Sequence, residues 1–182
     1  MADPQHEEVL DAHDRRSVAL YRLGHAMTAV GLLANAAAWA FRPDAVAGGE
    51  IAIASGVALA CANMHLYDKR IRWFIGCAAW LGLVIMVGGA RADLPILRLA
   101  GLGFVFVALS GLALKERLCF RIPGLVFVPL LLATSLVPMV ANYGPGAALL
   151  QTLAGAVLCV LAVAKVLQPL HFDIGDKSRY QV

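Results

Sequence analysis

The sequence predicts an all-α polytopic membrane protein, a bundle of six transmembrane helices arranged as three hairpins with both termini in the cytoplasm. Three observations predict this fold class. The 182-residue chain is 60% hydrophobic, whereas soluble domains are about 45–50% apolar. The apolar residues gather in six long stretches, and about 20 such residues cross a hydrocarbon core about 30 Å thick. The third observation is the placement of the basic residues between those stretches.

Lysine and arginine concentrate in alternate gaps between the apolar stretches. Of the fifteen, only Arg42, Arg91 and Arg98 fall in the other gaps. Short cytoplasmic loops carry an excess of Lys and Arg, so this asymmetry predicts both the span count and the orientation. The membrane in which we expect the protein is a bacterial inner membrane. The twelve cations on the predicted cytoplasmic side are Arg15, Arg16, Arg22, Lys69, Arg70, Arg72, Lys115, Arg117, Arg121, Lys165, Lys177 and Arg179. They cluster at helix ends rather than on one face, so no nucleic-acid partner is predicted.

Local signals place each element in order. Asp3-Pro4 is typical of a helix start, and Arg42-Pro43-Asp44 ends the first span. The predicted spans cover residues 23–41, 46–66, 73–90, 96–114, 122–140 and 147–167. A polar N-terminal segment (1–17) precedes the transmembrane domain (18–170), and a cytoplasmic tail (171–182) follows it. Because all five connections are short, successive helices are expected to be antiparallel neighbours. The fifth span contains Pro129 and Pro138, which neighbouring helices make tolerable in a membrane.

Small residues mark the expected packing faces, because membrane helices associate through close backbone contact and interhelical hydrogen bonds. The first span carries Gly24, Thr28, Gly31, Asn35 and Ala38 at spacings of four, three, four and three. The second carries Ala52, Gly56, Ala60 and Asn63. We expect these two faces to meet, with both asparagines hydrogen-bonded to partner helices. Another interpretation is that Asn35 and Asn63 line a polar pathway.

The polar side chains that need an explanation lie near the predicted cytoplasmic surface. The candidate functional cluster comprises His25, Asn63, His65, Glu116, Cys119, His171 and Asp173. Cys61 and His65 are four residues apart and share a helix face. Together with His171 they form a candidate tetrahedral metal site, and two histidines from different helices are an alternative haem-ligand pair. The interpretation that we favour is that these histidines are interfacial residues at the headgroup level.

Other classes of chemistry find less support. Glu50, Arg98 and Lys165 lie near span ends, and a central charge, which would mark a proton path, is absent from the spans. The Gly-x-Ser-x-Gly elbow and the phosphate-binding glycine loops are absent too. Because no catalytic residue set can be named, enzymatic activity is not predicted.

Three short motifs carry a family resemblance. They are His65-Leu66-Tyr67, the run from Lys115 to Phe120, and the run from Pro169 to Ser178, which alternates apolar and polar residues before a Gly-Asp turn. In these motifs and across the six apolar stretches, the chain resembles an uncharacterised family of bacterial and cyanobacterial integral membrane proteins. The resemblance implies a six-span fold and no particular activity.

Three functions remain open at this point. The first is a non-enzymatic accessory, scaffold or assembly protein whose cytoplasmic face binds a membrane-protein partner. The second is a metal- or haem-binding redox protein. The third is a small-solute carrier or channel, suggested by the asparagine-bearing faces and by the two prolines of the fifth span.

Overall fold

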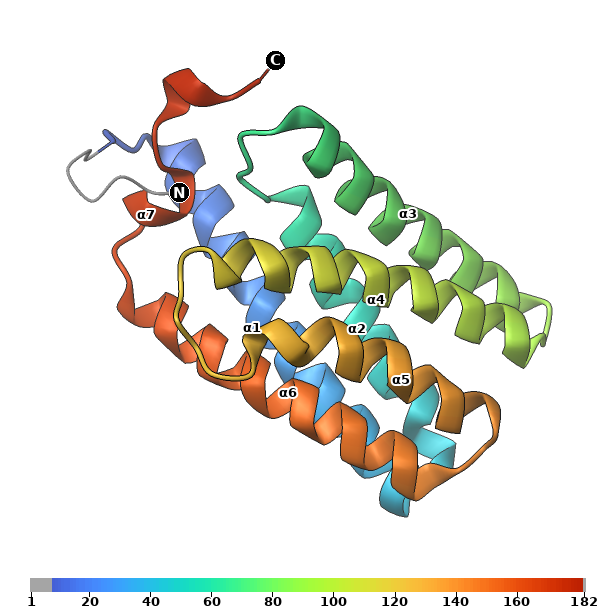
Figure 1. The fold of residues 1–182 in the computed structure, drawn as a ribbon. Coiled ribbons are helices and arrows are strands. Elements are labelled where there is room, and N and C mark those ends of the chain that lie inside the picture. The colour runs from blue at the N-terminus through green and yellow to red at the C-terminus, as the bar shows by residue number, and fades with distance from the viewer. Residues whose placement is uncertain (1–7, 182) are drawn as a thin grey trace.

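The described chain folds entirely into helices and turns. The computed structural model describes residues 8–181. Its long helices are α1 (Ala12–Phe41), α2 (Val46–Ala62), α3 (Lys69–Arg91), α4 (Pro95–Arg117), α5 (Val128–Val140) and α6 (Gly144–Leu167). Its short helices are η1 (Pro43–Ala45), η2 (Leu125–Phe127), α7 (His171–Ile174) and η3 (Lys177–Arg179). Successive long helices run antiparallel (Figure 1). The all-α class is confirmed.

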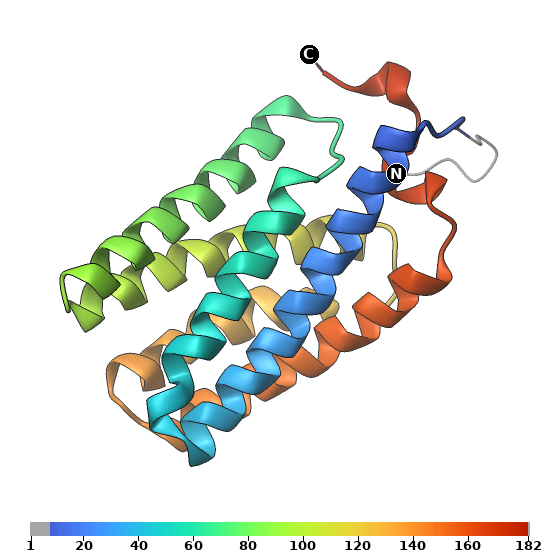
Figure 2. The ribbon, with the colours of Figure 1, turned by 180° about the vertical axis from the view of Figure 1, so that it is seen from behind.

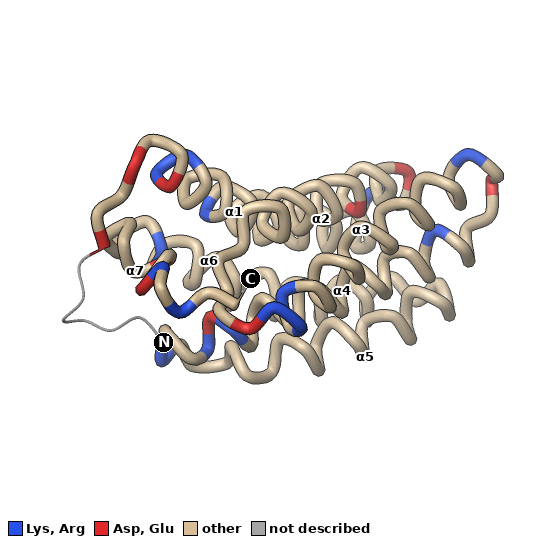
Figure 3. Tube along the Cα trace, turned by 90° about the horizontal axis from the view of Figure 1, so that it is seen from above, with Lys and Arg blue, Asp and Glu red and all other residues tan. Residues whose placement is uncertain are grey.

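Several helices have the length and composition of membrane spans. Four helical segments of the described chain meet both requirements, namely Pro43–Ala62, α3, α4 and α6. The segment Leu125–Val140 is apolar but shorter. Lysine, arginine, aspartate and glutamate gather toward the ends of the long helices and leave stretches without these charged residues between them (Figure 3). The structure therefore contains several apolar helices of spanning type, while the six-span count stays a prediction.

The first helix is longer than its predicted span because a capping box starts it in the polar segment. The Asp11 side chain accepts a hydrogen bond from the Asp14 backbone N–H at 2.8 Å, and the Asp14 side chain accepts one from the Asp11 backbone N–H at 3.0 Å. Such reciprocal bonds satisfy N–H groups that a helix start leaves unpaired. The predicted start at Asp3-Pro4 lies outside the described residues.

Two helices have other bounds than the spans predicted for them. The second helix ends at Ala62 rather than at residue 66, and Asn63 caps it with non-helical backbone angles. The fifth is helical only from η2 onward, because Gly124 adopts a left-handed φ of +88° directly after Pro123. Pro129 consequently lies in the first turn of α5, where a missing N–H costs little, whereas Pro138 is interior.

Helices α1 and α2 meet at the predicted small-residue seam. A Cβ added at Gly24 would stand 2.7 Å from the Gly56 carbonyl oxygen, and one at Gly56 would stand 2.5 Å from the Thr28 hydroxyl. The Asn35 amide donates to Gln151 Oε1 of α6 at 2.8 Å, so its predicted interhelical bond is confirmed. The prediction for Asn63 is wrong, because its amide donates to the Leu59 carbonyl of its own helix at 2.9 Å.

The remaining contacts close the bundle and leave one hairpin leaning outward. Helix α6 returns beside α1, where Gly155 faces Leu32 and Leu33. Helices α3 and α4 pack closely at Gly82 and Gly101. Both ribbon views show the turn of this α3–α4 hairpin diverging from the turn that joins α1 and α2 (Figures 1 and 2).

Candidate functional site

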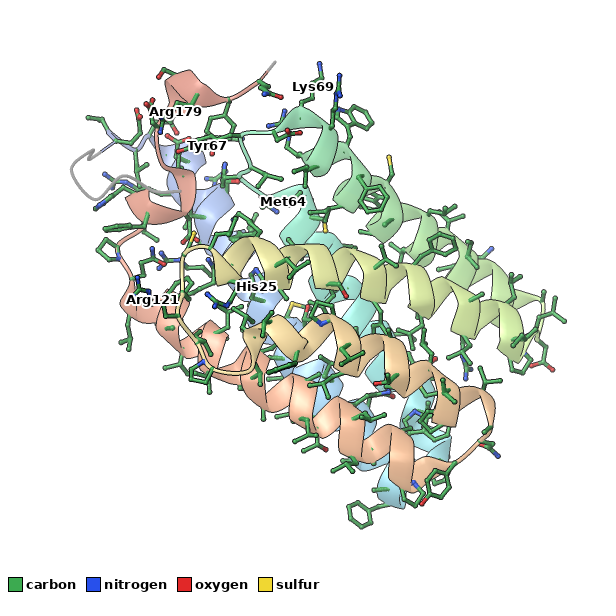
Figure 4. The ribbon with its side chains drawn as sticks, in the orientation of Figure 1. His25, Met64, Tyr67, Lys69, Arg121 and Arg179 are labelled. Carbon is green, nitrogen blue, oxygen red and sulfur yellow. The ribbon has the colours of Figure 1, made fainter. Side chains whose placement is uncertain are left out.

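The residues after α6 fold back over one end of the bundle. We call residues 171–181 the cap; it contains α7 and η3. Tyr67, in the α2–α3 loop, holds the cap in two places: its hydroxyl accepts from the Asp176 N–H at 2.8 Å, and its carbonyl accepts from the Gln181 N–H at 3.1 Å. Figure 4 shows Tyr67 and Arg179 at this end of the molecule. Gly175, with φ +67°, turns the chain directly against the Tyr67 hydroxyl.

Beneath the cap lies a buried set of ionic side chains that we call the ion cluster. Its members are Tyr21 and Arg22 of α1, Lys115 and Glu116 of α4, Lys165 of α6, and Asp173 of the cap. Lys165 lies at its centre, because its Nζ is 2.8 Å from Glu116 Oε2 and 2.5 Å from Asp173 Oδ1. The Lys165 and Glu116 side chains are each 1% exposed and the Asp173 side chain 2%. Three helices and the cap therefore converge on one ammonium group.

The other members complete the hydrogen bonds of the two carboxylates. Tyr21 donates to Glu116 Oε1 at 2.5 Å and accepts from Lys115 Nζ at 2.9 Å. Arg22 donates from Nε to Asp173 Oδ2 at 2.7 Å. It also donates to the Gln168 and Pro169 carbonyls, where the chain leaves α6. Arg22 thus holds both the start of the cap and its buried carboxylate.

The ion cluster is better suited to fixing one arrangement than to adding stability. Desolvation of buried charges offsets much of their attraction, whereas removing one partner leaves a costly unpaired charge. Fully satisfied polar networks favour a single geometry because the alternatives leave groups unpaired. Arg22, Lys115 and Lys165 face Glu116 and Asp173, so the cluster holds one cation more than it has carboxylates.

A small cavity of about 80 Å³ lies between the cap and the bundle. It unites several predicted site residues, since His65, Glu116, Cys119 and Asp173 all line it together with Tyr180. His65 is held by the Ser17 hydroxyl, 3.1 Å from Nε2, and lies edge-on to the Tyr180 ring. The cavity has room for a few water molecules rather than for a haem.

The other predicted site residues lie apart from this cavity. His25 is buried inside the bundle (Figure 4), edge-on to Tyr21 at 4.8 Å, and its Nε2 has no hydrogen-bond partner among the described residues. His171 stacks on Phe172 and lines a different hollow with Arg15. Asn63 bonds only within its own helix among the described residues. Four of the seven candidates therefore line the cavity beneath the cap, and the other three, His25, His171 and Asn63, lie elsewhere.

The predicted metal ligands do not converge. Among the residues that the structure describes, one set of three potential ligand atoms lies within 4.8 Å of one another, and it consists of Asp11, His13 and Asp14 at the exposed start of α1. Cys61, His65 and His171 form no such set. Burial raises the pKa of the Cys119 thiol, and the Glu116 carboxylate raises it further, which disfavours the thiolate that binds metal.

Sequence reasoning missed the partners that make Glu116 and Asp173 a site. We interpreted Arg22 and Lys165 as topology or span-end charges, and we did not single out Tyr21. Lys165 lies inside the sixth apolar stretch, and a lysine in such a position is a usable signal of a buried polar site. Glu50 and Arg98, considered separately as headgroup-level charges, form an ion pair at 2.8 Å near the opposite end of the bundle.

An outer ion pair between Lys177 of the cap and Asp14 of α1 predicts a pH dependence of cap docking. Its hydrogen bond lowers the pKa of Asp14 below the usual 3.8 and raises the pKa of Lys177 above the usual 10.5. Because the Asp14 pKa falls on folding, the contribution of the pair is present above pH 3.8 and disappears as pH falls through the lower folded pKa. Because the Lys177 pKa rises on folding, the contribution of the pair to cap docking is complete below pH 10.5. It is lost as pH rises through the higher folded pKa of Lys177.

A spin label at Arg179→Cys measures this dependence through cap mobility. At pH 7 the label should be more mobile in an Asp14→Asn variant than in the parent protein. Near pH 3 the difference should shrink, because protonation of Asp14 mimics the substitution. A difference that is unchanged between pH 7 and pH 3 would contradict the assignment, and the Asp14→Asn protein itself controls for acid effects elsewhere.

Comparisons with known proteins agree with this description. A family model described as an uncharacterized integral membrane protein (DUF2301) matches residues 59–182. This range includes Glu116, Lys165 and Asp173. An uncharacterized protein from Haemophilus influenzae is 33% identical over 183 residues, and the comparison covers the whole of both chains. No solved structure matches the chain. The predicted resemblance to a family of integral membrane proteins is confirmed.

Proposed function

Since the chain belongs to the DUF2301 family of uncharacterized integral membrane proteins, we propose that it is a non-enzymatic accessory or scaffold protein. The capped end of its bundle is the surface that binds a partner membrane protein. In this proposal the six long helices span a bacterial inner membrane, and both termini lie in the cytoplasm. The placement of twelve of the fifteen cations in gaps at the capped end supports that orientation.

The observation that carries the proposal is the buried anchoring of the cap by Lys165 and Asp173. A tail that only followed the last span would need no buried carboxylate 2.5 Å from a buried ammonium group. The anchoring gives the terminal segment one fixed shape, and the exposed residues Lys177, Ser178 and Arg179 stand on its outer side. A preorganised surface binds with a smaller loss of conformational entropy than a flexible tail.

The alternatives find less support in the geometry. The Asn35 amide donates to Gln151 of α6 and the Asn63 amide donates within its own helix, so both amide nitrogens already bond within the protein, which disfavours the solute pathway interpretation. For the metal alternative, the one converging set of potential ligands among the described residues is Asp11, His13 and Asp14 at the exposed start of α1, rather than the predicted Cys61, His65 and His171. Metal analysis and an optical spectrum of the purified protein test that alternative directly, and a stoichiometric metal or a haem band would support it over the scaffold proposal.

Site-specific photo-cross-linking in cells tests the partner surface. A photoreactive residue at Arg179 should give an adduct of one defined mass, because this position lies on the fixed cap. The matched control is Asp93, an exposed turn residue at the opposite end. The Arg179 adduct should weaken several-fold when Asp173→Asn releases the cap. The proposal fails if Arg179 gives no adduct, or if both positions give the same one.

A further inference from the structure

The end of the bundle away from the cap contains a crevice with an ion pair on its wall. It is about 430 Å³ in volume and lies between α2, α3 and α4, where the α3–α4 hairpin diverges. Ile51, Leu83, Met86 and Val87 supply apolar walls, and Ile51 and Val87 are 63% and 48% exposed. A second hollow of about 350 Å³ lies on the other side of the same ion pair. The crevice is therefore open at its side and mostly apolar.

Three polar groups here lack hydrogen-bond partners among the described residues. Glu50 is 2% exposed, and its Oε2 lies 2.8 Å from Arg98 Nε without hydrogen-bond alignment. The indole N–H of Trp39, which lines the second hollow, is also unpartnered. Buried groups without partners are rare in native proteins, and each needs an explanation such as a bound molecule. Of the six such atoms in the described chain, Glu50 Oε2 and Arg98 Nε belong to residues that line the crevice, and Trp39 Nε1 belongs to the neighbouring hollow.

The charges of the crevice specify the sign of a ligand. Arg91 and Arg98 both line it, whereas Glu50 is its one carboxylate. Arg91 forms no ion pair with a described residue, and the Arg98 side chain is 34% exposed. Arginine recognises phosphate by paired, charge-assisted hydrogen bonds. One uncompensated positive charge thus stands at the mouth of an apolar crevice, close to the turn between α3 and α4.

We propose that this crevice binds one anionic phospholipid. The lipid phosphate accepts hydrogen bonds from Arg98 and Arg91, and an acyl chain lies against Ile51 and Val87. A phospholipid fits better than a soluble anion because exposed apolar side chains of helices of spanning type, such as Ile51 and Val87, line the crevice. It fits better than an uncharged lipid because of the uncompensated arginine. The site is independent of the cap, at the other end of the bundle.

Native mass spectrometry of the delipidated full-length protein tests the site with phosphatidylglycerol, phosphatidylcholine and a free fatty acid offered separately. One phosphatidylglycerol should be retained, at about tenfold lower concentration than is needed for phosphatidylcholine. Arg98→Gln should abolish this preference. Arg91→Gln leaves the Glu50–Arg98 pair intact and should reduce the preference several-fold. The Arg91 variant therefore tests the proposal independently of whether the Arg98 variant folds. Arg42→Gln is the matched control, an exposed arginine paired with Asp44 instead.

Three results would overturn the proposal. Equal retention of the charged and the neutral lipid would show that the arginines do not select the headgroup. An equal loss of retention in the Arg42 variant would place the effect outside the crevice. Tighter retention of the free fatty acid than of phosphatidylglycerol would remove the phospholipid as the ligand.

Discussion

Replacing Lys165 by methionine should destabilise the protein by about 3–5 kcal/mol and release the cap. The substitution leaves Glu116 and Asp173 buried without the ammonium group that they share. Breaking a buried ion pair from one side costs roughly this amount. Thermal denaturation in detergent measures the stability, and the mobility of a spin label at Arg179→Cys measures cap release.

Lys177→Met is the matched control for this substitution. It removes a cap lysine of the same kind, but this lysine pairs with Asp14 near the surface. Solvent screens exposed ion pairs, so its effect on denaturation should be small. Equal effects of the two lysine substitutions would contradict a central role for Lys165.

A second large loss of stability is expected from a substitution at the contact between α1 and α2. Gly56→Val should destabilise the bundle by about 3 kcal/mol, the upper part of the usual range for overpacking. Its Cβ would stand 2.5 Å from the Thr28 hydroxyl and 2.9 Å from the Gly24 carbonyl oxygen, and the backbone of α1 cannot move aside as a flexible side chain would. Denaturation in detergent and the yield of folded protein measure the effect.

Gly48→Val controls for the loss of a glycine on the same helix. A Cβ at Gly48 meets nothing within 4 Å, so only helix propensity changes there. We expect the Gly48 variant to denature close to the parent protein. A Gly48 variant as unstable as the Gly56 variant would show that close helix approach is not what the seam requires.

The sequence predicted best those features that depend on the residues of one helix alone. Apolar runs located the long helices, and the spacing of Gly24, Gly31 and Gly56 identified the α1–α2 contact. These features depend on the period of one helix and on the size of its residues. Boundaries were less certain, because Asn63 and Gly124 stop their helices through local backbone conformations that an apolar run does not reveal.

The site was only half visible in the sequence for a physical reason. Glu116 and Asp173 were identified as unusual polar residues, but their partners come from α1 and α6. Short connections predict that sequential helices are neighbours, but they do not predict that α6 returns beside α1. The pairing of Glu50 with Arg98 likewise depends on the approach of α2 to α4. Charge partners across a bundle therefore need the tertiary arrangement.

The measurement that tests the central claim most directly is the side of the membrane on which the cap lies. In a variant without native cysteines, single cysteines replace Arg179 in the cap and Asn142 in the α5–α6 turn. A membrane-impermeant maleimide applied to intact spheroplasts should label Asn142→Cys, and it should label Arg179→Cys only after permeabilisation. Labelling of Arg179→Cys in intact spheroplasts would place the capped end outside the cytoplasm and contradict the account.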